Sequence, residues 1–127
     1  MRYLFYIAIC LLFISGCAKK QDDTTQTTGS SVSYQSPDTG ESMLVIDVRT
    51  KQEYSSGHIK GAINISYNEI ANKIENYTSD KNQKILLYCL SGSRSGVALS
   101  TLKKEGYTNV ENIGSFDDAK AYFKSLQ

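Results

Sequence analysis

Histidine is nearly absent from this chain, since His58 is its only copy. A lone histidine beside a single free cysteine offers too few ligands to anchor a metal such as zinc, so we expect no metal site and no cofactor. An excess of charge is also missing, because 14 basic side chains face 13 acidic ones. Without a basic patch the chain lacks the usual electrostatic footprint of a nucleic-acid-binding domain, and we expect no nucleic-acid partner.

Long hydrophobic runs are confined to the first residues. Residues 3–14 form an apolar run after Arg2, too short to span a bilayer comfortably and typical of a secretory signal. The run ends in Ile14-Ser15-Gly16-Cys17, which resembles the lipobox of bacterial lipoproteins. That resemblance implies cleavage before Cys17 and diacylglyceryl modification of its thiol. An ordinary cleaved signal and an uncleaved anchor with an incidental cysteine are the alternatives.

We therefore expect three segments. Residues 1–16 are a lipoprotein signal peptide, and 17–41 are a lipidated cysteine followed by a flexible polar linker that holds the only proline, Pro37. Such a polar stretch buries too little apolar surface to fold alone, although 32–34 can form a short edge strand. Residues 42–127 are the globular domain, attached to a membrane through the lipid in the bacterial cell envelope and facing the periplasm or the exterior.

The chain has three cysteines, and we expect two of them to be unavailable as free thiols. Cys10 leaves with the signal and Cys17 carries lipid, so Cys89 is the only free thiol. An exported domain with one free cysteine cannot form an internal disulfide. Such a leftover thiol is either reactive or intermolecular, and the alternative is an inert core cysteine.

Short apolar runs alternate with helical patterns from residue 42 onward. Four runs read as strands, at 43–46, 62–65, 84–88 and 109–113, and the first is consistent with a strand buried on both faces. The apolar positions of three helical patterns are Ile70, Ala71 and Ile74, then Val97, Ala98 and Leu102, then Phe116, Ala119, Phe123 and Leu126. Gly106 is placed as the C-terminal cap of the second helix. The alternation predicts an α/β fold with a small, mostly parallel sheet and helices on both faces.

The segment Cys89-Leu90-Ser91-Gly92-Ser93-Arg94-Ser95 joins the third predicted strand to a helix that starts near Ser95. Ligands of such sheets bind beyond the carboxyl ends of the strands. The small residues let the backbone curl, so that successive N–H groups form an anion-binding nest at the start of a helix. A cysteine at the edge of this nest should have a lowered pKa, and Arg94 offers a planar fork to an oxyanion.

Three further motifs precede this loop in the chain: Asp47-Val48-Arg49, Glu53-Tyr54 and the GHIKGAINI stretch at 57–65. Together with the loop they resemble the rhodanese-like, single-domain sulfurtransferase family over about residues 44–127. The resemblance implies a three-layer fold and covalent catalysis by Cys89. Its thiolate takes the outer sulfur of a small anionic donor such as thiosulfate, and the persulfide passes that sulfur to cyanide, a thiol or a protein acceptor. We expect a monomer.

The resemblance also suggests roles for the other motif residues. Backbone N–H groups of residues 90–94 would stabilise the terminal sulfur of the persulfide, and Arg94 would orient the donor. One of the hydroxyls of Ser91, Ser93 and Ser95 is expected to cap the following helix.

The remaining motif residues are expected to support the site. Arg49 and Glu53 are four apart, a spacing that permits an ion pair on a short helix. Asp47 either accepts hydrogen bonds from loop amides or joins that pair. His58 is expected to be structural rather than a catalytic base.

Two features depart from the family. Only about ten residues separate Tyr34 from Leu44, where the family usually has a strand and a helix, so the N-terminal region is shortened. Gly114-Ser115 stands where the family often has two glycines.

Other functions remain open. Cysteine phosphatases place five residues between cysteine and arginine, whereas four separate Cys89 from Arg94, and Tyr88 stands where they usually have histidine. Arsenate reduction, which uses a related loop, ranks lower. The main alternative is a persulfide carrier or a thiol-redox or protein-binding module with little thiosulfate turnover.

Overall fold

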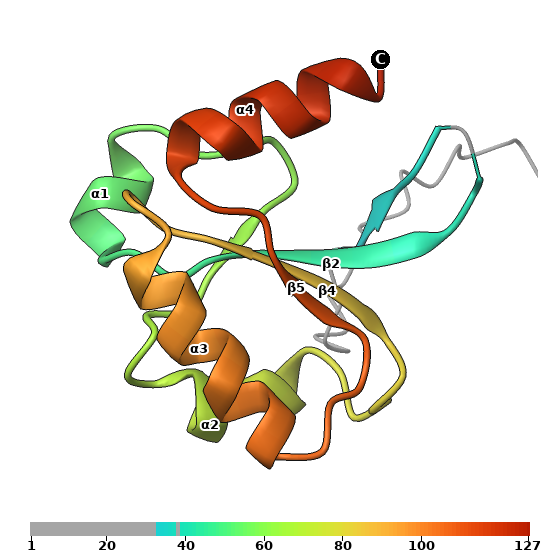
Figure 1. The fold of residues 1–127 in the computed structure, drawn as a ribbon, viewed down its shortest axis with the longest axis vertical. Helices are drawn as coiled ribbons and strands as arrows, with labels where there is room; N and C mark the ends of the chain where they lie inside the picture. Colours follow the sequence, from blue (N-terminus) through green and yellow to red (C-terminus); the bar gives the residue numbers. More distant parts are fainter. Residues whose placement is uncertain (1–32, 38) are drawn as a thin grey trace, which may run out of the picture.

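Two parallel strands, β2 (Ser42–Asp47) and β4 (Lys84–Tyr88), form the centre of the sheet in a computed structural model that describes residues 33–37 and 39–127 (Figure 1). β5 (Val110–Asn112) runs parallel to β4 on its outer side. The short strands β1 (Tyr34–Gln35) and β3 (Ile63–Asn64) share the other edge of β2. Among the strands described, only β1 is antiparallel to its neighbour, so the mostly parallel sheet is confirmed.

The N-terminal expectations fall largely beyond the described residues. The predicted signal peptide at 1–16, the lipidation site at Cys17 and the linker up to residue 32 all lie outside them. β1 belongs to the stretch assigned to the linker, yet it pairs with β2, and the ring of Tyr34 packs edge-on against Phe123 with centroids 5.0 Å apart. Within the described residues, no helix combines the length and the hydrophobicity needed to cross a membrane.

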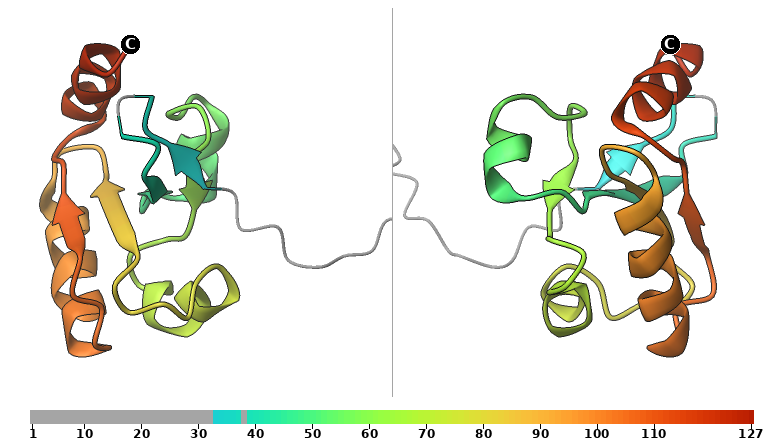
Figure 2. Two further views of the ribbon diagram at one scale, coloured as in Figure 1. Left: turned by 90° about the vertical axis from the view of Figure 1, so that its right-hand side faces the viewer. Right: turned by 60° about the vertical axis from the view of Figure 1, so that its left-hand side comes forward.

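Helices cover both faces of the sheet, which makes three layers (Figure 1, Figure 2). α2 (Ile70–Lys73), continued by the 3-10 turn Ile74–Asn76, and α3 (Ser93–Lys104) pack on one face, and α4 (Phe116–Ser125) packs on the other. α1 (Lys51–Ser55) follows β2 directly and buries no residue completely. It therefore lies at the carboxyl end of the sheet rather than in either hydrophobic layer.

Side chains of β2 and β4 alternate between the two faces, and both sets are buried. On one face Leu44, Ile46, Ile85 and Leu87 of the strands pack with Ala98 and Leu102 of α3. On the other face Met43, Val45, Leu86 and Tyr88 of the strands pack with Ala119 and Phe123 of α4. Burial of one large apolar side chain contributes about 1.5–3 kcal/mol, so the continuous apolar runs explain why these strands sit between two helical layers.

The C-terminal end of α3 confirms the predicted glycine cap. Gly106 has a φ of +91°, its N–H donates to the carbonyl of Lys103 at 3.1 Å, and the N–H of Tyr107 donates to Leu102 at 3.0 Å. This is the Schellman arrangement. The assignment of Val97 to the buried face is wrong, because Val97 is 52% exposed. Successive helical residues point about 100° apart. The buried face of α3 therefore contains Ala98 and not Val97.

Ser115, which stands where the family often has a second glycine, caps the start of α4. The Ser115 hydroxyl accepts the N–H of Asp118 at 3.1 Å, and the Asp118 carboxylate accepts the N–H of Ser115 at 2.9 Å. This capping box begins α4. Hydrogen bonds from the Ser115 hydroxyl and N–H lower the pKa of Asp118.

A buried tyrosine hydroxyl generates the first prediction. Tyr88 accepts the N–H of Ile59 at 3.0 Å. Tyr88→Phe leaves this buried N–H without a partner, which should lower the free energy of unfolding by about 1–3 kcal/mol. Urea unfolding measures the change. Tyr67→Phe, at a side chain that is 37% exposed, is the matched control and should change stability by less than about 0.5 kcal/mol.

Candidate active site

Cys89 follows the last residue of β4 and lies at the carboxyl edge of the sheet. Its side chain is completely buried, whereas Leu90 beside it is 58% exposed. The turn into α3 is made by Gly92, whose φ is +89°, and an added Cβ there would come within 3.4 Å of the Gly114 backbone. Glycine is therefore favoured at this position chiefly by the left-handed backbone conformation.

The sulfur of Cys89 faces a ring of donors. The N–H of Gly92 lies 3.0 Å from Sγ and the hydroxyl of Ser95 lies 3.5 Å from it. Burial raises the pKa of the Cys89 thiol, but hydrogen bonds from the Ser95 hydroxyl and from the N–H groups of Ser95, Ser91 and Gly92 outweigh it, and the pKa is lowered overall. The loop thus has the lowered thiol pKa that its composition predicts.

The expected serine cap of α3 is wrong. The N-cap residue is Gly92, with no side-chain hydrogen bond to the helix start. Ser91 and Ser93 are exposed, and the Ser95 hydroxyl points back to the carbonyl of Gly92 at 2.9 Å. The N–H groups of Gly92 and Ser95 bond the sulfur of Cys89 instead of a capping oxygen.

Arg94 is paired across the site with α1. Its two terminal nitrogens lie 2.9 Å and 2.8 Å from the two carboxylate oxygens of Glu53, a bidentate ion pair. The pair lowers the pKa of Glu53 to about 2 and raises the pKa of Arg94. The predicted pairing of Glu53 with Arg49 is wrong, because the helix begins at Lys51 and Arg49 is not on it.

Arg49 instead forms a buried pair with Asp47. Their closest atoms are 2.6 Å apart, and the side chains are 5% and 0% exposed. Asp47 Oδ1 also accepts the backbone N–H of Arg49 at 2.9 Å, and Arg49 donates to the carbonyl of Gly57 at 2.6 Å. The guanidinium lies 4.4 Å from the ring centre of Phe116. This pair ties the end of β2 to the 57–61 turn and to α4.

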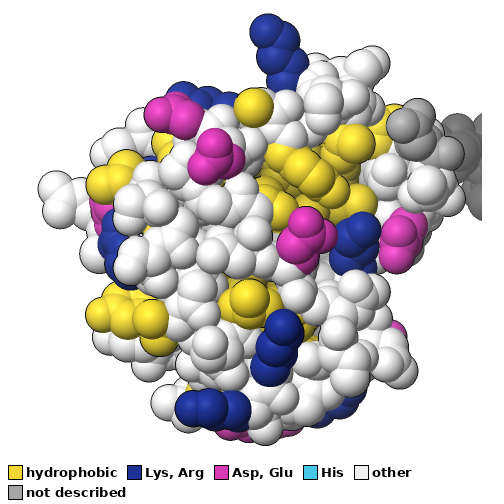
Figure 3. All heavy atoms as spheres, in the orientation of Figure 1, with side chains coloured by type: hydrophobic (Ala, Val, Ile, Leu, Met, Phe, Trp, Pro, Cys, Tyr) yellow, Lys and Arg dark blue, Asp and Glu magenta, His cyan; other side chains and the backbone are white. Residues whose placement is uncertain are grey.

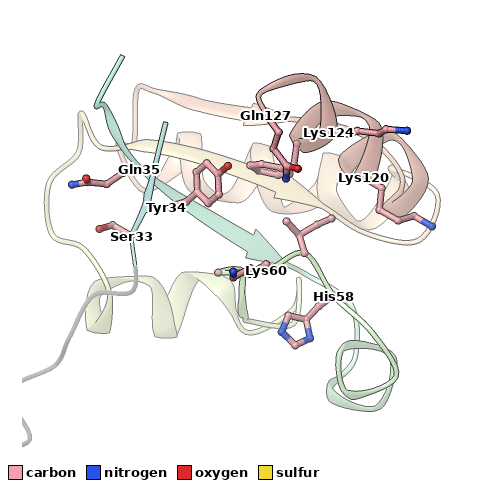
Figure 4. A pocket seen from close by; sticks show the side chains of 11 residues that line it. Ser33, Tyr34, Gln35, His58, Lys60, Lys120, Lys124 and Gln127 are labelled. Atoms are coloured by element: carbon pink, nitrogen blue, oxygen red, sulfur yellow. The ribbon is translucent and has the colours of Figure 1, made fainter. Parts of the chain in front are cut away.

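His58 packs against Tyr54 of α1. Its Nδ1 lies 3.0 Å from the carbonyl of Tyr54, and the two rings stack with centroids 3.7 Å apart. His58 also lines a cavity of about 570 Å³ between β1, the turn after α1 and α4, together with residues such as Lys60 and Phe123 (Figure 4). None of the residues lining this cavity belongs to the 89–95 loop.

Two surface observations bear on ligands. Within residues 33–37 and 39–127, no group of three or more His, Cys, Asp or Glu side chains forms a potential metal site. Lysine and arginine side chains are interspersed with aspartate and glutamate on the face drawn in Figure 3. This face of the described residues therefore carries no broad patch of positive charge that would attract an anion.

One residue of the site was not predicted from the sequence. Asn112, at the end of β5, accepts the Ser95 hydroxyl at 2.8 Å and the N–H of Gly114 at 2.9 Å, and it donates to the carbonyl of Gly92 at 3.1 Å. The available signal was a polar side chain at the carboxyl end of a predicted parallel strand.

Comparisons with known proteins agree with this geometry. The family model of the rhodanese-like domain matches residues 33–121. The chain is 42% identical over 73 residues to thiosulfate sulfurtransferase PspE of Escherichia coli (strain K12), covering 58% of this chain and 70% of that protein. It is 35% identical over 79 residues to putative sulfur carrier protein YrkF of Bacillus subtilis (strain 168), covering 62% of this chain and 42% of that protein.

A solved structure, "rhodanese with anions from E. coli", has 41% sequence identity and a TM-score of 0.58. The match covers 60% of this chain and 89% of that one. The similarity therefore extends over nearly all of the solved chain.

The Glu53–Arg94 pair predicts a specific pH dependence. Because the pKa of Glu53 falls from 4.5 to about 2 on folding, its contribution to stability is complete above the unfolded pKa and is lost as pH falls toward 2. Glu53→Gln should lower the free energy of unfolding by about 1–2 kcal/mol at pH 6, and by clearly less at pH 3. Urea unfolding at both values measures this.

Glu75→Gln serves as the control for this measurement. Glu75 is 71% exposed and lies 3.5 Å from Lys81, and such surface pairs contribute about 0–1 kcal/mol. An equal loss for Glu53→Gln at both pH values would contradict the assignment.

Proposed function

The chain belongs to the rhodanese-like family, and on that premise we propose that it is a sulfurtransferase in which Cys89 carries the transferred sulfur. The observation that supports this most strongly is the buried sulfur surrounded by hydrogen-bond donors. The Gly92 N–H at 3.0 Å and the Ser95 hydroxyl at 3.5 Å stabilise negative charge there and lower the pKa of the thiol. An activated thiolate is what nucleophilic attack on sulfur requires.

The reaction has two balanced steps. The Cys89 thiolate attacks the outer sulfur of thiosulfate, a new S–S bond forms, the S–S bond of the donor breaks, and sulfite leaves with the electron pair. Attack of cyanide on the outer sulfur then gives thiocyanate and returns the thiolate. A thiolate acceptor leaves as a persulfide in the same way. Each step exchanges one nucleophile for another at sulfur, so no cofactor is needed.

The loop supplies the electrostatic part of the proposal. Preorganised N–H dipoles stabilise charge without reorganisation during the reaction, and we assign this role to the N–H groups of residues 90–94. We assign to Arg94 the orientation of the anionic donor. Glu53 holds its guanidinium in place through two hydrogen bonds, which fixes its position and also offsets its charge.

A second candidate is a persulfide carrier that is loaded by a partner protein. One observation favours it: the carboxylate of Glu53 already fills the fork of Arg94, so less positive charge is available to a free dianion. In this case the Cys89 thiolate takes the outer sulfur of the partner's persulfide, and the partner leaves as a thiolate. The putative sulfur carrier protein among the relatives gives this function a precedent.

We also propose that the protein acts as a monomer in the cell envelope. The sequence Ile14-Ser15-Gly16-Cys17 supports a lipid on Cys17, with the domain facing the periplasm or the exterior. More than one acyl chain makes such anchoring stable, because each buried CH₂ adds about 0.8 kcal/mol.

Mass spectrometry tests the sulfur transfer. The full chain with Cys10→Ser and Cys17→Ser, incubated with thiosulfate, should gain about 32 Da, one sulfur atom, on Cys89. Cyanide should remove the added mass and release thiocyanate. Cys89→Ser in the same background should gain nothing.

The outcomes separate the two candidates. No gain from thiosulfate, with Cys89 still open to alkylation, would reject the thiosulfate reaction. Loading from a protein persulfide in that situation would support the carrier.

Metabolic labelling tests the anchor. Bacteria expressing the wild-type chain and fed labelled palmitate should incorporate the label into the protein, and Cys17→Ser should abolish it. Cys10→Ser is the control and should leave the labelling unchanged. Labelling that survives Cys17→Ser would refute the lipidation site.

A further inference from the structure

The hydroxyl of Ser95 has more acceptors than it can serve. Its oxygen lies 2.8 Å from Asn112 Oδ1, 2.9 Å from the carbonyl of Gly92 and 3.5 Å from Cys89 Sγ. A hydroxyl has one proton and donates one hydrogen bond at a time. Because Ser95 is completely buried, the direction of this proton is decided by the protein groups around it.

The carbonyl of Gly92 is the least available of the three. It already accepts the N–H of Gly96 at 3.0 Å and the side-chain N–H of Asn112 at 3.1 Å. A carbonyl oxygen has two lone pairs, and both are occupied. The choice for the Ser95 proton is therefore between Asn112 and the sulfur of Cys89.

The amide orientation of Asn112 follows from its neighbours. The N–H of Gly114 lies 2.9 Å away and can only donate, so the atom facing it is the oxygen. The carbonyl of Gly92 can only accept, so the atom facing it is the nitrogen. Asn112 Oδ1 thus keeps one lone pair for the Ser95 hydroxyl.

We infer that Asn112 is a positioning residue whose side-chain oxygen holds the Ser95 proton while the sulfur of Cys89 is uncharged and yields it when the sulfur is a thiolate. A neutral thiol is a weak acceptor, and at 3.5 Å it does not compete with an amide oxygen at 2.8 Å. A thiolate is a charged acceptor and attracts the proton more strongly.

Rotation of one hydroxyl then switches the environment of the sulfur. Under the proposed function, on which this step rests, transfer of the charge to the outer sulfur of a persulfide would return the proton to Asn112. The Ser95 hydroxyl would donate to the attacking thiolate and would stop donating to the inner sulfur once the persulfide has formed. No backbone atom would need to move.

Charged groups approach the loop from several elements. They are Arg94 of α3, Glu53 of α1, the Asp47–Arg49 pair at the end of β2 and Asp118 of α4. None of them is altered in the variants below, so their influence on the thiol is common to all proteins compared.

The test is the pH dependence of Cys89 alkylation by iodoacetamide. It uses the full chain carrying Cys10→Ser and Cys17→Ser, in which Cys89 is the only thiol. Alkylation reports the thiolate fraction directly. It requires no sulfur transfer, so its result is independent of whether thiosulfate loads the protein.

Three shifts of the alkylation midpoint are expected. Ser95→Ala removes the donor and should raise it by about 0.5–1 pH unit. Asn112→Leu removes the competing oxygen and should lower it by about half a unit. Asn112→Asp provides a stronger acceptor and a negative charge, and should raise it.

A double variant makes the comparison decisive. In the Ser95→Ala background, Asn112→Leu should have no effect, because no hydroxyl remains to be redirected. Asn109→Leu is the matched control, since Asn109 bonds the exposed carbonyl of Asn82 at 3.3 Å, and it should leave the midpoint unchanged.

Two results would overturn the inference. Upward shifts for both Asn112→Leu and Asn112→Asp would mean that Asn112 only supports the loop. A shift for Asn112→Leu that persists without the Ser95 hydroxyl would mean that it acts by another route. Should circular dichroism show that Asn112→Leu is unfolded, the Asn112→Asp shift must become smaller in the Ser95→Ala background for the inference to stand.

The same measurements separate this inference from the proposed function. A persulfide that forms while the midpoints stay fixed would leave the function intact and refute the role of Asn112. Midpoints that move as expected while thiosulfate fails to load the protein would support the role of Asn112 and reject the thiosulfate reaction.

Discussion

The pairing of β4 between β2 and β5 is the constraint on which the site depends. On one side, the N–H of Val48 donates to the carbonyl of Tyr88 at 3.0 Å, and on the other the N–H of Cys89 donates to Gly114 at 3.2 Å. These bonds carry the sheet past the last residue of the strand. They bring the groups that follow β2 and β5, Asn112 among them, to the same edge as the thiol. These groups meet because the carboxyl ends of parallel strands lie at one edge of the sheet. Residues near each group in the chain do not determine this proximity.

Burying a sulfur that carries charge costs free energy, and the loop offsets that cost mainly with dipoles. Arg94, the arginine of the loop, is paired with Glu53, and the buried Arg49 is paired with Asp47. Each guanidinium is therefore nearly neutralised by its own carboxylate. A thiolate at this position is stabilised by one hydroxyl and by backbone N–H groups, and the N–H groups remain in place whatever the charge of the incoming molecule.

Much of this could be predicted from the sequence because it depends on local patterns. Apolar runs identify buried strands, the composition of the 89–95 loop predicts a cysteine with a lowered pKa, and Gly106 marks a helix end. The pairings that failed depend on tertiary geometry. Glu53 and Arg94 are 41 positions apart, and only the fold brings α1 to the start of α3.

The other misses have equally physical causes. Asn112 resembles any polar residue that ends a strand, and its role requires knowing that β5 pairs with β4. Val97 is apolar, as a core residue would be, but its position around the helix axis places it on the exposed side. The expected serine cap failed because the N-cap residue is Gly92, which has no side chain to accept a hydrogen bond.

β5 is also the outer strand of the sheet in the described part of the chain, and it is only three residues long. Its middle residue, Glu111, is exposed. Two copies meeting along this edge would gain few backbone hydrogen bonds and would bring two carboxylates face to face. Short, charged edges of this kind disfavour strand-to-strand aggregation, so the strand that supplies Asn112 to the thiol site also protects the sheet from growing into its neighbours.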